Sequence, residues 1–200
     1  MKKVLLLVLL VVAGPAAADG LSYNYVQAGY ASADLDFDDY AVGVDVDGDG
    51  WALGGSFAVS DNVHLFAGHS AIGLDFGVEG LSFGVDLDST NIGIGYNHSL
   101  GENTDFVAGL SYIKSELEFE GLSADQDGYG VSIGLHTKLS ETIELAGGIE
   151  YGDLDEGGSS TAFTASILFD LTDNVAFGVG GGWDDDVTMY QAGFRFYFGD

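Results

Sequence analysis

Apolar and polar residues alternate along most of the chain, and this alternation is typical of β-strands with one apolar and one polar face. In residues 190–199, the even positions from Tyr190 to Phe198 are aromatic or small, while the odd positions include Gln191, Gly193 and Arg195. Nine earlier segments show the same period of two. They cover residues 21–31, 51–60, 63–77, 83–98, 105–120, 128–139, 142–154, 161–171 and 174–184. With the C-terminal segment, the pattern predicts ten strands.

The all-β fold that this pattern indicates is a closed antiparallel transmembrane β-barrel, whose strands are apolar toward the lipid and polar toward the lumen. Short polar turns fall at every second connection, as at the periplasmic end of such barrels. They cover residues 60–62, 99–104, 140–141 and 172–174. An even strand number also returns both ends of the barrel to one side of the membrane. Because each strand gives a weak signal, eight strands with one protruding hairpin is the alternative.

The N-terminus has the features of a secretory signal peptide. Lys2 and Lys3 precede an unbroken apolar run over residues 4–12, and the three alanines of residues 16–18 form a small-residue cleavage site. Nine apolar residues are too few for a helix that spans a bilayer. We therefore expect residues 1–18 to be a signal peptide and residues 19–200 to form the barrel domain. The chain has no Cys, so no disulfide is expected.

The C-terminus carries a second targeting pattern. Gln191, Gly193, Phe196 and Phe198 have the spacing polar-x-Gly-x-x-aromatic-x-aromatic, which resembles the sorting signal that outer-membrane barrels present to their insertion machinery. The sequence departs from that signal in its last two residues, because the final aromatic usually ends the chain. The pattern implies the outer membrane of a Gram-negative bacterium as the location. The expected partners are membrane lipid and the insertion machinery, and the expected state is a monomer.

Several motifs in the mature chain resemble one family of small bacterial outer-membrane β-barrels. These motifs are Leu21-Ser22-Tyr23-Asn24-Tyr25-Val26, Asp49-Gly50-Trp51, His64-Leu65-Phe66-Ala67-Gly68, Gly128-Tyr129 and Gly134-Leu135. They are similar to those of OmpA/OmpX-like barrels, and in particular to a family once described as a sulfation-dependent quorum factor. The resemblance implies an outer-membrane barrel without an agreed biochemical activity.

The charge of the chain is strongly negative. After loss of the signal peptide, only Lys114, Lys138 and Arg195 remain against 32 acidic residues. On the strand map above, 22 of these acidic residues lie in the five outward connections or in the strand ends beside them, which predicts acidic extracellular loops. Such a rim repels nucleic acid, so nucleic-acid binding is excluded. Weak binding of Ca²⁺ or Mg²⁺ to the whole rim is expected, and no other cofactor.

One acidic segment resembles a calcium-binding loop. Asp45, Asp47 and Asp49 stand at positions 1, 3 and 5 of such a loop, and Gly50 stands at position 6. The twelfth position, where a bidentate Glu belongs, is Ser56, and it already lies in a predicted strand. The alternative interpretation is a solvated acidic loop that ends in a glycine turn.

The histidines do not predict a catalytic site. His64, His98 and His136 fall near the periplasmic ends of predicted strands, and His69 falls near the middle of the membrane. None of them reaches the acidic rim, where an Asp and His pair could activate water. His69 and Ser70 are adjacent in a strand, so their side chains point to opposite faces. We therefore expect a protein that is not an enzyme.

Charged residues are also predicted inside the barrel, at Lys138, Glu144, Glu150, Asp170 and Arg195. Charges in a narrow lumen must pair, and we expect Arg195 to bind Glu150, Asp170 or both. A ten-stranded barrel is narrow enough for such side chains to plug it. The sequence thus indicates a non-enzymatic outer-membrane barrel with acidic extracellular loops that serves envelope integrity or surface interaction. The alternative is a small cation-selective pore.

Overall fold

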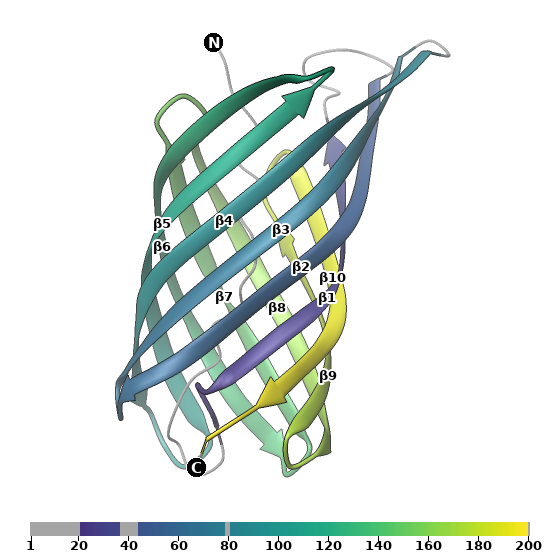
Figure 1. Cartoon of the computed structure of the whole chain (residues 1–200). Coiled ribbons are helices and arrows are strands. Elements are labelled where there is room, and N and C mark those ends of the chain that lie inside the picture. Colours follow the sequence, from purple (N-terminus) through teal and green to yellow (C-terminus); the bar gives the residue numbers. More distant parts are fainter. Residues whose placement is uncertain (1–20, 37–43, 79–80, 200) are drawn as a thin grey trace.

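A computed structural model describes residues 21–36, 44–78 and 81–199, and these residues form one closed β-barrel (Figure 1). The predicted signal peptide lies outside the described residues. The ten strands are β1 Tyr25–Asp36, β2 Val44–Ser60, β3 Val63–Val78, β4 Leu81–Ser99, β5 Thr104–Phe119, β6 Leu122–Ser140, β7 Ile143–Leu154, β8 Gly158–Thr172, β9 Val175–Trp183 and β10 Val187–Tyr197.

Each strand pairs antiparallel with its neighbours in sequence, and β1 closes the barrel against β10. This closing pair runs from Tyr25 opposite Tyr197 to Leu35 opposite Val187. The predicted ten strands are therefore confirmed, and the eight-stranded alternative is wrong. Closure leaves no sheet edge, so every strand finds ladder partners on both sides, as a lipid environment requires. Among the described residues, no helix is long and apolar enough to cross a membrane.

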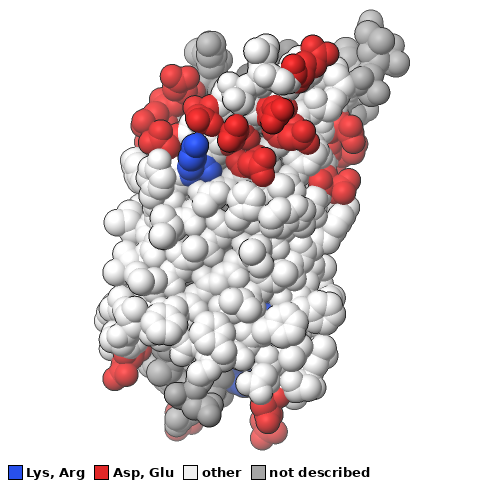
Figure 2. Space-filling view, in the orientation of Figure 1, with Lys and Arg blue, Asp and Glu red and all other residues white. Residues whose placement is uncertain are grey.

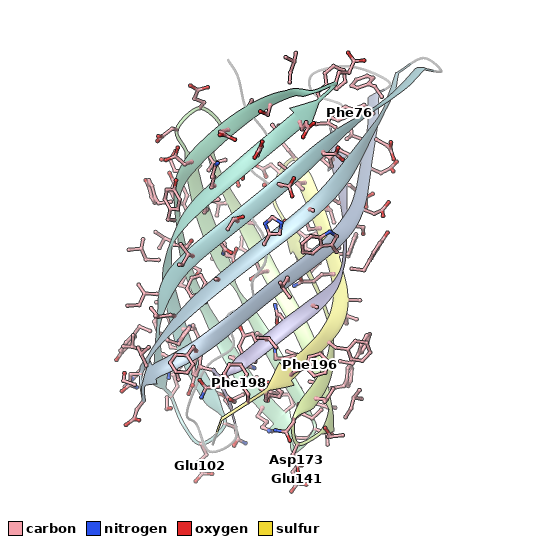
Figure 3. All side chains as sticks on the ribbon, viewed as in Figure 1. Phe76, Glu102, Glu141, Asp173, Phe196 and Phe198 are labelled. Carbon is pink, nitrogen blue, oxygen red and sulfur yellow. The ribbon has the colours of Figure 1, made fainter. Side chains whose placement is uncertain are left out.

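The four turns predicted for the periplasmic end are present at the end where β1 begins and β10 ends. They cover residues 61–62, 100–103, 141–142 and 173–174. The pairing register shifts beside the three two-residue turns, at Ala58/Ser60, Lys138/Ser140 and Asp170/Thr172. Figure 3 labels Glu102, Glu141 and Asp173 at this end of the barrel. A bulge next to each tight turn increases the local twist of the hairpin.

At the opposite end the strands are longer than the sequence predicts. Residues 121–127 were expected to be a loop, but β5 and β6 continue to a two-residue hairpin at Glu120 and Gly121, whose φ angles are 49° and 80°. These left-handed angles are those of the tight turns that match strand twist. β2 likewise begins at Val44 rather than at the predicted residue 51. The ladder bonds to neighbouring strands override the low strand propensity of Asp and Gly in these segments.

The outer face carries the predicted apolar belt. On most strands the belt begins with an aromatic residue just below the last acidic or polar one, as expected at a membrane interface. These residues are Tyr30, Trp51, Tyr112, Tyr129, Tyr151, Trp183 and Tyr190. Figure 2 shows the wide uncharged belt with acidic side chains gathered above it. The alternation in the sequence therefore assigned the lipid-facing side chains correctly.

Candidate functional site

Many of the acidic residues above the belt lie on strands, where loops were predicted, while Asp155, Glu156 and residues 184–186 lie in the connections that follow β7 and β9. Asp47 of β2 stands between Asp34 of β1 and Asp75 of β3 in the pairing register, and all three side chains are exposed. Like charges directly opposite one another in a sheet repel. The extracellular extension of the barrel therefore presents an anionic wall, which we define as the outward acidic residues of β1 to β6 above the belt.

A second part of this acidic wall crosses β4, β5 and β6. Asp86 lies opposite Glu118, Asp88 lies opposite Glu116, and Glu116 also lies opposite Asp125. The one ion pair with a lysine on this wall among the described residues joins Lys114 Nζ to Asp125 Oδ2 at 3.5 Å. Both side chains are half exposed, so this pair contributes little to stability. The wall is thus far from neutralised by the protein's own cations.

The segment that resembles a calcium-binding loop is part of a strand and not a loop. Residues 45–50 belong to β2, where Asp47 and Asp49 point outward and Val46 points into the barrel. In a strand, alternate side chains lie side by side about 6.6 Å apart instead of wrapping around one ion. No group of three or more His, Cys, Asp and Glu side chains in the described part of the chain could hold a metal ion. Weak divalent binding by Asp45, Asp47 and Asp49 stays a prediction.

The interior of the extracellular extension is apolar, which the sequence analysis missed. Side chains from five neighbouring strands form one buried cluster, which we call the apolar layer. Its members are Ala31, Ala33, Leu35, Val46, Ile72, Leu74, Leu87, Val187 and Met189. Phe76, Val85 and Leu117 pack against it, and Figure 3 labels Phe76 at this end of the barrel. The lumen is therefore not polar throughout.

The interior of the periplasmic end is ionic, as predicted for Lys138, Glu144 and Asp170. Lys138 Nζ lies 3.7 Å from Glu144 Oε1 and 3.7 Å from Asp170 Oδ2. Glu144 Oε2 also lies 3.2 Å from His136 Nε2, and both of these side chains are almost fully buried. Each carboxylate in this cluster therefore has a basic partner, as buried charges require.

Arg195 lies inside the barrel as predicted, and its neighbours include Gln27 of β1. Its Nε and Nη2 atoms donate to Gln27 Oε1 at 3.1 and 2.8 Å, and its guanidinium lies 4.0 Å from the centre of the Tyr25 ring. Among the described residues, Glu150 forms no ion pair with Arg195. A direct pair with Asp170 stays a prediction. Arg195 and Gln27 stand opposite each other where β10 meets β1.

The segment before β1 folds into the periplasmic mouth, which the sequence analysis also missed. Tyr23 is fully buried, its ring stacks on His64 at 4.3 Å, and its hydroxyl donates to Asp105 Oδ2 at 3.4 Å. Burial, followed by the neighbouring Asp105 carboxylate, raises the pKa of the Tyr23 hydroxyl far above its usual value. The hydroxyl therefore stays protonated and keeps donating to Asp105. Residues 21–24 thus narrow the lumen from below.

The prediction that no histidine reaches the acidic rim is wrong for His69, which lies beside Asp88 of the acidic wall rather than near the middle of the membrane. On the outer face of β3, its Nδ1 lies 2.9 Å from Thr90 Oγ1, its Nε2 lies 3.6 Å from Asp88 Oδ1, and its ring contacts Trp51. Ser70 points inward, as predicted. The backbone amides around His69 and Thr90 lie within the ladder from β2 to β4, where neighbouring strands occupy them. This segment therefore lacks the free backbone donors of an oxyanion hole.

The four residues of the expected sorting signal lie on the closing strand and just beyond it. Phe196 and Phe198 point outward near the periplasmic end (Figure 3). Close packing requires glycine at position 193, because a Cβ there would collide with the carbonyl oxygen of Ala28. Gln191 lines the lumen nearby. Whether these residues direct insertion stays a prediction.

Ten antiparallel strands form a closed barrel whose lumen is filled by side chains and whose outer face carries an apolar belt. These features define an integral outer-membrane β-barrel. The chain belongs to the family of the outer membrane protein beta-barrel domain, whose model matches residues 4–198. The expected membership of a small outer-membrane barrel family of the OmpA/OmpX type is confirmed, and so is the location in the outer membrane of Gram-negative bacteria. No curated protein matches the chain in sequence.

Solved outer-membrane barrels share the fold at low sequence identity. An outer membrane channel from Pseudomonas putida F1 is 11% identical, with a TM-score of 0.56 over 88% of this chain and 95% of the channel. The translocator domain of the autotransporter NalP from Neisseria meningitidis is 12% identical, with a TM-score of 0.50 over 88% and 89%. The NanC porin is 6% identical, with a TM-score of 0.52 over 87% of this chain and 100% of the porin.

Proposed function

We propose that the protein is a non-enzymatic, non-conducting outer-membrane barrel that acts through its extracellular acidic wall, in envelope integrity or surface interaction. The observation that carries the proposal is the layering of the lumen. The apolar layer lies below the extracellular rim, and the ionic cluster of Lys138, Glu144 and Asp170 lies at the periplasmic end. An ion crossing the barrel would pass the apolar side chains of β10 and β1 to β4 and then meet the ionic cluster.

The apolar layer is the stronger barrier of the two. An ion keeps its hydration shell in water, and no polar side chain replaces that shell in a layer built from Ala, Leu, Ile, Val and Met. Apolar constrictions of this kind exclude water and so prevent ions from crossing a pore without a conformational change. At the other end, Tyr23 and its contacts with His64 and Asp105 add a second obstruction.

The acidic wall supports a role outside the cell. Its carboxylates stand just above the belt, where the head groups of the outer leaflet lie. An anionic wall repels lipid phosphates unless divalent cations bridge the two. We therefore infer that the wall binds Ca²⁺ or Mg²⁺ weakly and shares these ions with anionic lipid or with another surface.

Conductance in planar bilayers tests the proposal. The refolded wild-type protein should give no sustained openings. Slower migration on gels after boiling than before is the control that the protein in the bilayer sample is folded. Successful insertion is checked in the same bilayers by co-reconstitution with an open porin. Sustained openings that favour cations over anions would contradict the proposal and support the alternative, a small cation-selective pore.

The pore remains the second candidate because of one observation. Among the described inward positions, the carboxylates Asp105, Glu144, Glu150 and Asp170 face only two basic residues other than histidine, Lys138 and Arg195. An acidic lumen would select cations if it conducted.

A further inference from the structure

A cavity of about 80 Å³ lies in the lumen on the side of β4 to β8. Its polar lining comes from side chains of five strands, among them Asn91, Ser111, Ser132, Glu150 and Thr164. A water molecule needs roughly 10 to 15 Å³ of such volume, so the cavity can hold several waters or one hydrated ion. Its size and the polar side chains within a largely apolar lining make it a candidate binding site rather than a packing defect.

His136 also lines this cavity but already contacts Glu144, which leaves Glu150 as the carboxylate of the cavity. Unlike Glu144 and Asp170, it has no hydrogen bond or ion pair within the part of the chain that the structure describes. Its neighbours across the ladder are Ser132 on β6 and Ala162 on β8, neither of which carries charge. An ionised carboxylate in such surroundings is costly unless a cation joins it.

A second side chain points to the same conclusion. Asn91 is 92% buried, being only 8% exposed, and it lines the same cavity. Its carbonyl oxygen Oδ1 has no hydrogen-bond partner among the described residues. A buried amide oxygen normally has a partner, so this oxygen is available to a ligand or to the water that surrounds one.

We propose that this cavity binds one small monovalent cation, Na⁺ or K⁺, with Glu150 supplying the negative charge and Asn91 Oδ1 and the neighbouring hydroxyls holding its shell. The donors are all oxygens, which suits hard cations rather than transition metals. One carboxylate balances one positive charge, whereas a divalent ion would leave the site with one uncompensated positive charge. Binding in the cavity does not require conduction along the barrel.

Unfolding of the refolded barrel in chloride salts of K⁺, Na⁺ and the bulky N-methylglucamine cation, at equal ionic strength, tests the site. Wild type should unfold several degrees higher in K⁺ or Na⁺ than in N-methylglucamine, and Glu150→Gln should abolish this difference. Glu118→Gln, which removes an exposed carboxylate of the acidic wall, should retain it.

A tethered cation gives an independent variant if Glu150→Gln fails to fold. Ser132→Lys places an ammonium beside Glu150 in the register, so this variant should fold and lose its dependence on the salt cation. Broadening of the ²³Na resonance by wild-type protein, absent with Ser132→Lys, should report binding directly. Equal stability of wild type in all three salts, or retention of the Na⁺ effect in Glu150→Gln, would overturn the proposal.

Discussion

Replacing Asp47 by Asn should stabilise the barrel, and the gain should disappear at high salt. Asp47 lies directly opposite Asp34 on one side and Asp75 on the other, so it takes part in two like-charge contacts across strands. Asn keeps the size of the side chain and removes its charge. Since the three side chains are exposed, burial changes little, and the effect is electrostatic.

The expected magnitude follows from Coulomb's law. Carboxylates on directly opposite residues of a sheet, splayed into solvent, lie about 6 Å apart, and two unit charges at that distance in water repel by about 0.7 kcal/mol. Two such contacts give about 1.4 kcal/mol at very low salt. Screening reduces the sum to about 0.8 kcal/mol at 0.1 M salt and to about 0.2 kcal/mol at 1 M.

Urea unfolding of the refolded protein in lipid vesicles, at several NaCl concentrations, measures this gain in the free energy of unfolding. Glu102→Gln is the matched control, because Glu102 lies in the periplasmic turn over residues 100–103, away from the acidic wall (Figure 3). It should change stability little at any salt concentration. A gain in Asp47→Asn that is independent of salt, or a loss of stability at low salt, would refute the repulsion across the strands.

Three further outcomes are expected. Replacing Phe196 and Phe198 together by Ser should leave a periplasmic, protease-sensitive chain if these residues are part of a sorting signal. A variant that is recovered from the outer membrane at wild-type level and is still heat-modifiable would show that they are lipid anchors only. Each anchor would then stabilise the barrel by about 1.5 to 3 kcal/mol. Millimolar Ca²⁺ or Mg²⁺ should raise the melting temperature more than Na⁺ at equal ionic strength, and less so in Asp47→Asn; equal effects would reduce the acidic wall to a solubility feature. Tyr23→Phe should cost about 1 to 3 kcal/mol in urea unfolding because it leaves the buried Asp105 without its donor, and a smaller loss in Tyr23→Phe/Asp105→Asn than in the single variant would identify that hydrogen bond.

The C-terminal segment shows which features of the structure the alternation of residues predicts and which it does not. Alternation correctly placed Phe196 and Phe198 on the lipid face and Gly193 and Arg195 inside. It could not show that Gly193 lies against Ala28 and Gly29, or that Arg195 meets Gln27. Those neighbours are more than 160 residues away in the sequence, and only closure of the barrel brings β10 beside β1.

The sequence by itself determined the strand number, the lipid-facing side chains and the periplasmic turns. Each of these depends on neighbours within a few residues: a period of two sorts side chains between lipid and lumen, and turn residues mark where it stops. The same local evidence predicts loops for many acidic residues that lie on strands, because Asp and Gly have a low strand propensity.

Only the tertiary structure decided where the membrane ends within a strand. In β3, the apolar residues are outward at Leu65 but inward at Ile72 and Leu74, where Asp75 takes the outward position. The apolar side chains thus change from the outward face to the inward face along one strand that has no bulge. The reason is that lipid surrounds the lower part of the strand and water surrounds the upper part. Below this apolar layer, Glu150 lacks a basic partner because barrel closure places the lumen cations elsewhere. Distances across a lumen follow from closure and register, which no local pattern contains.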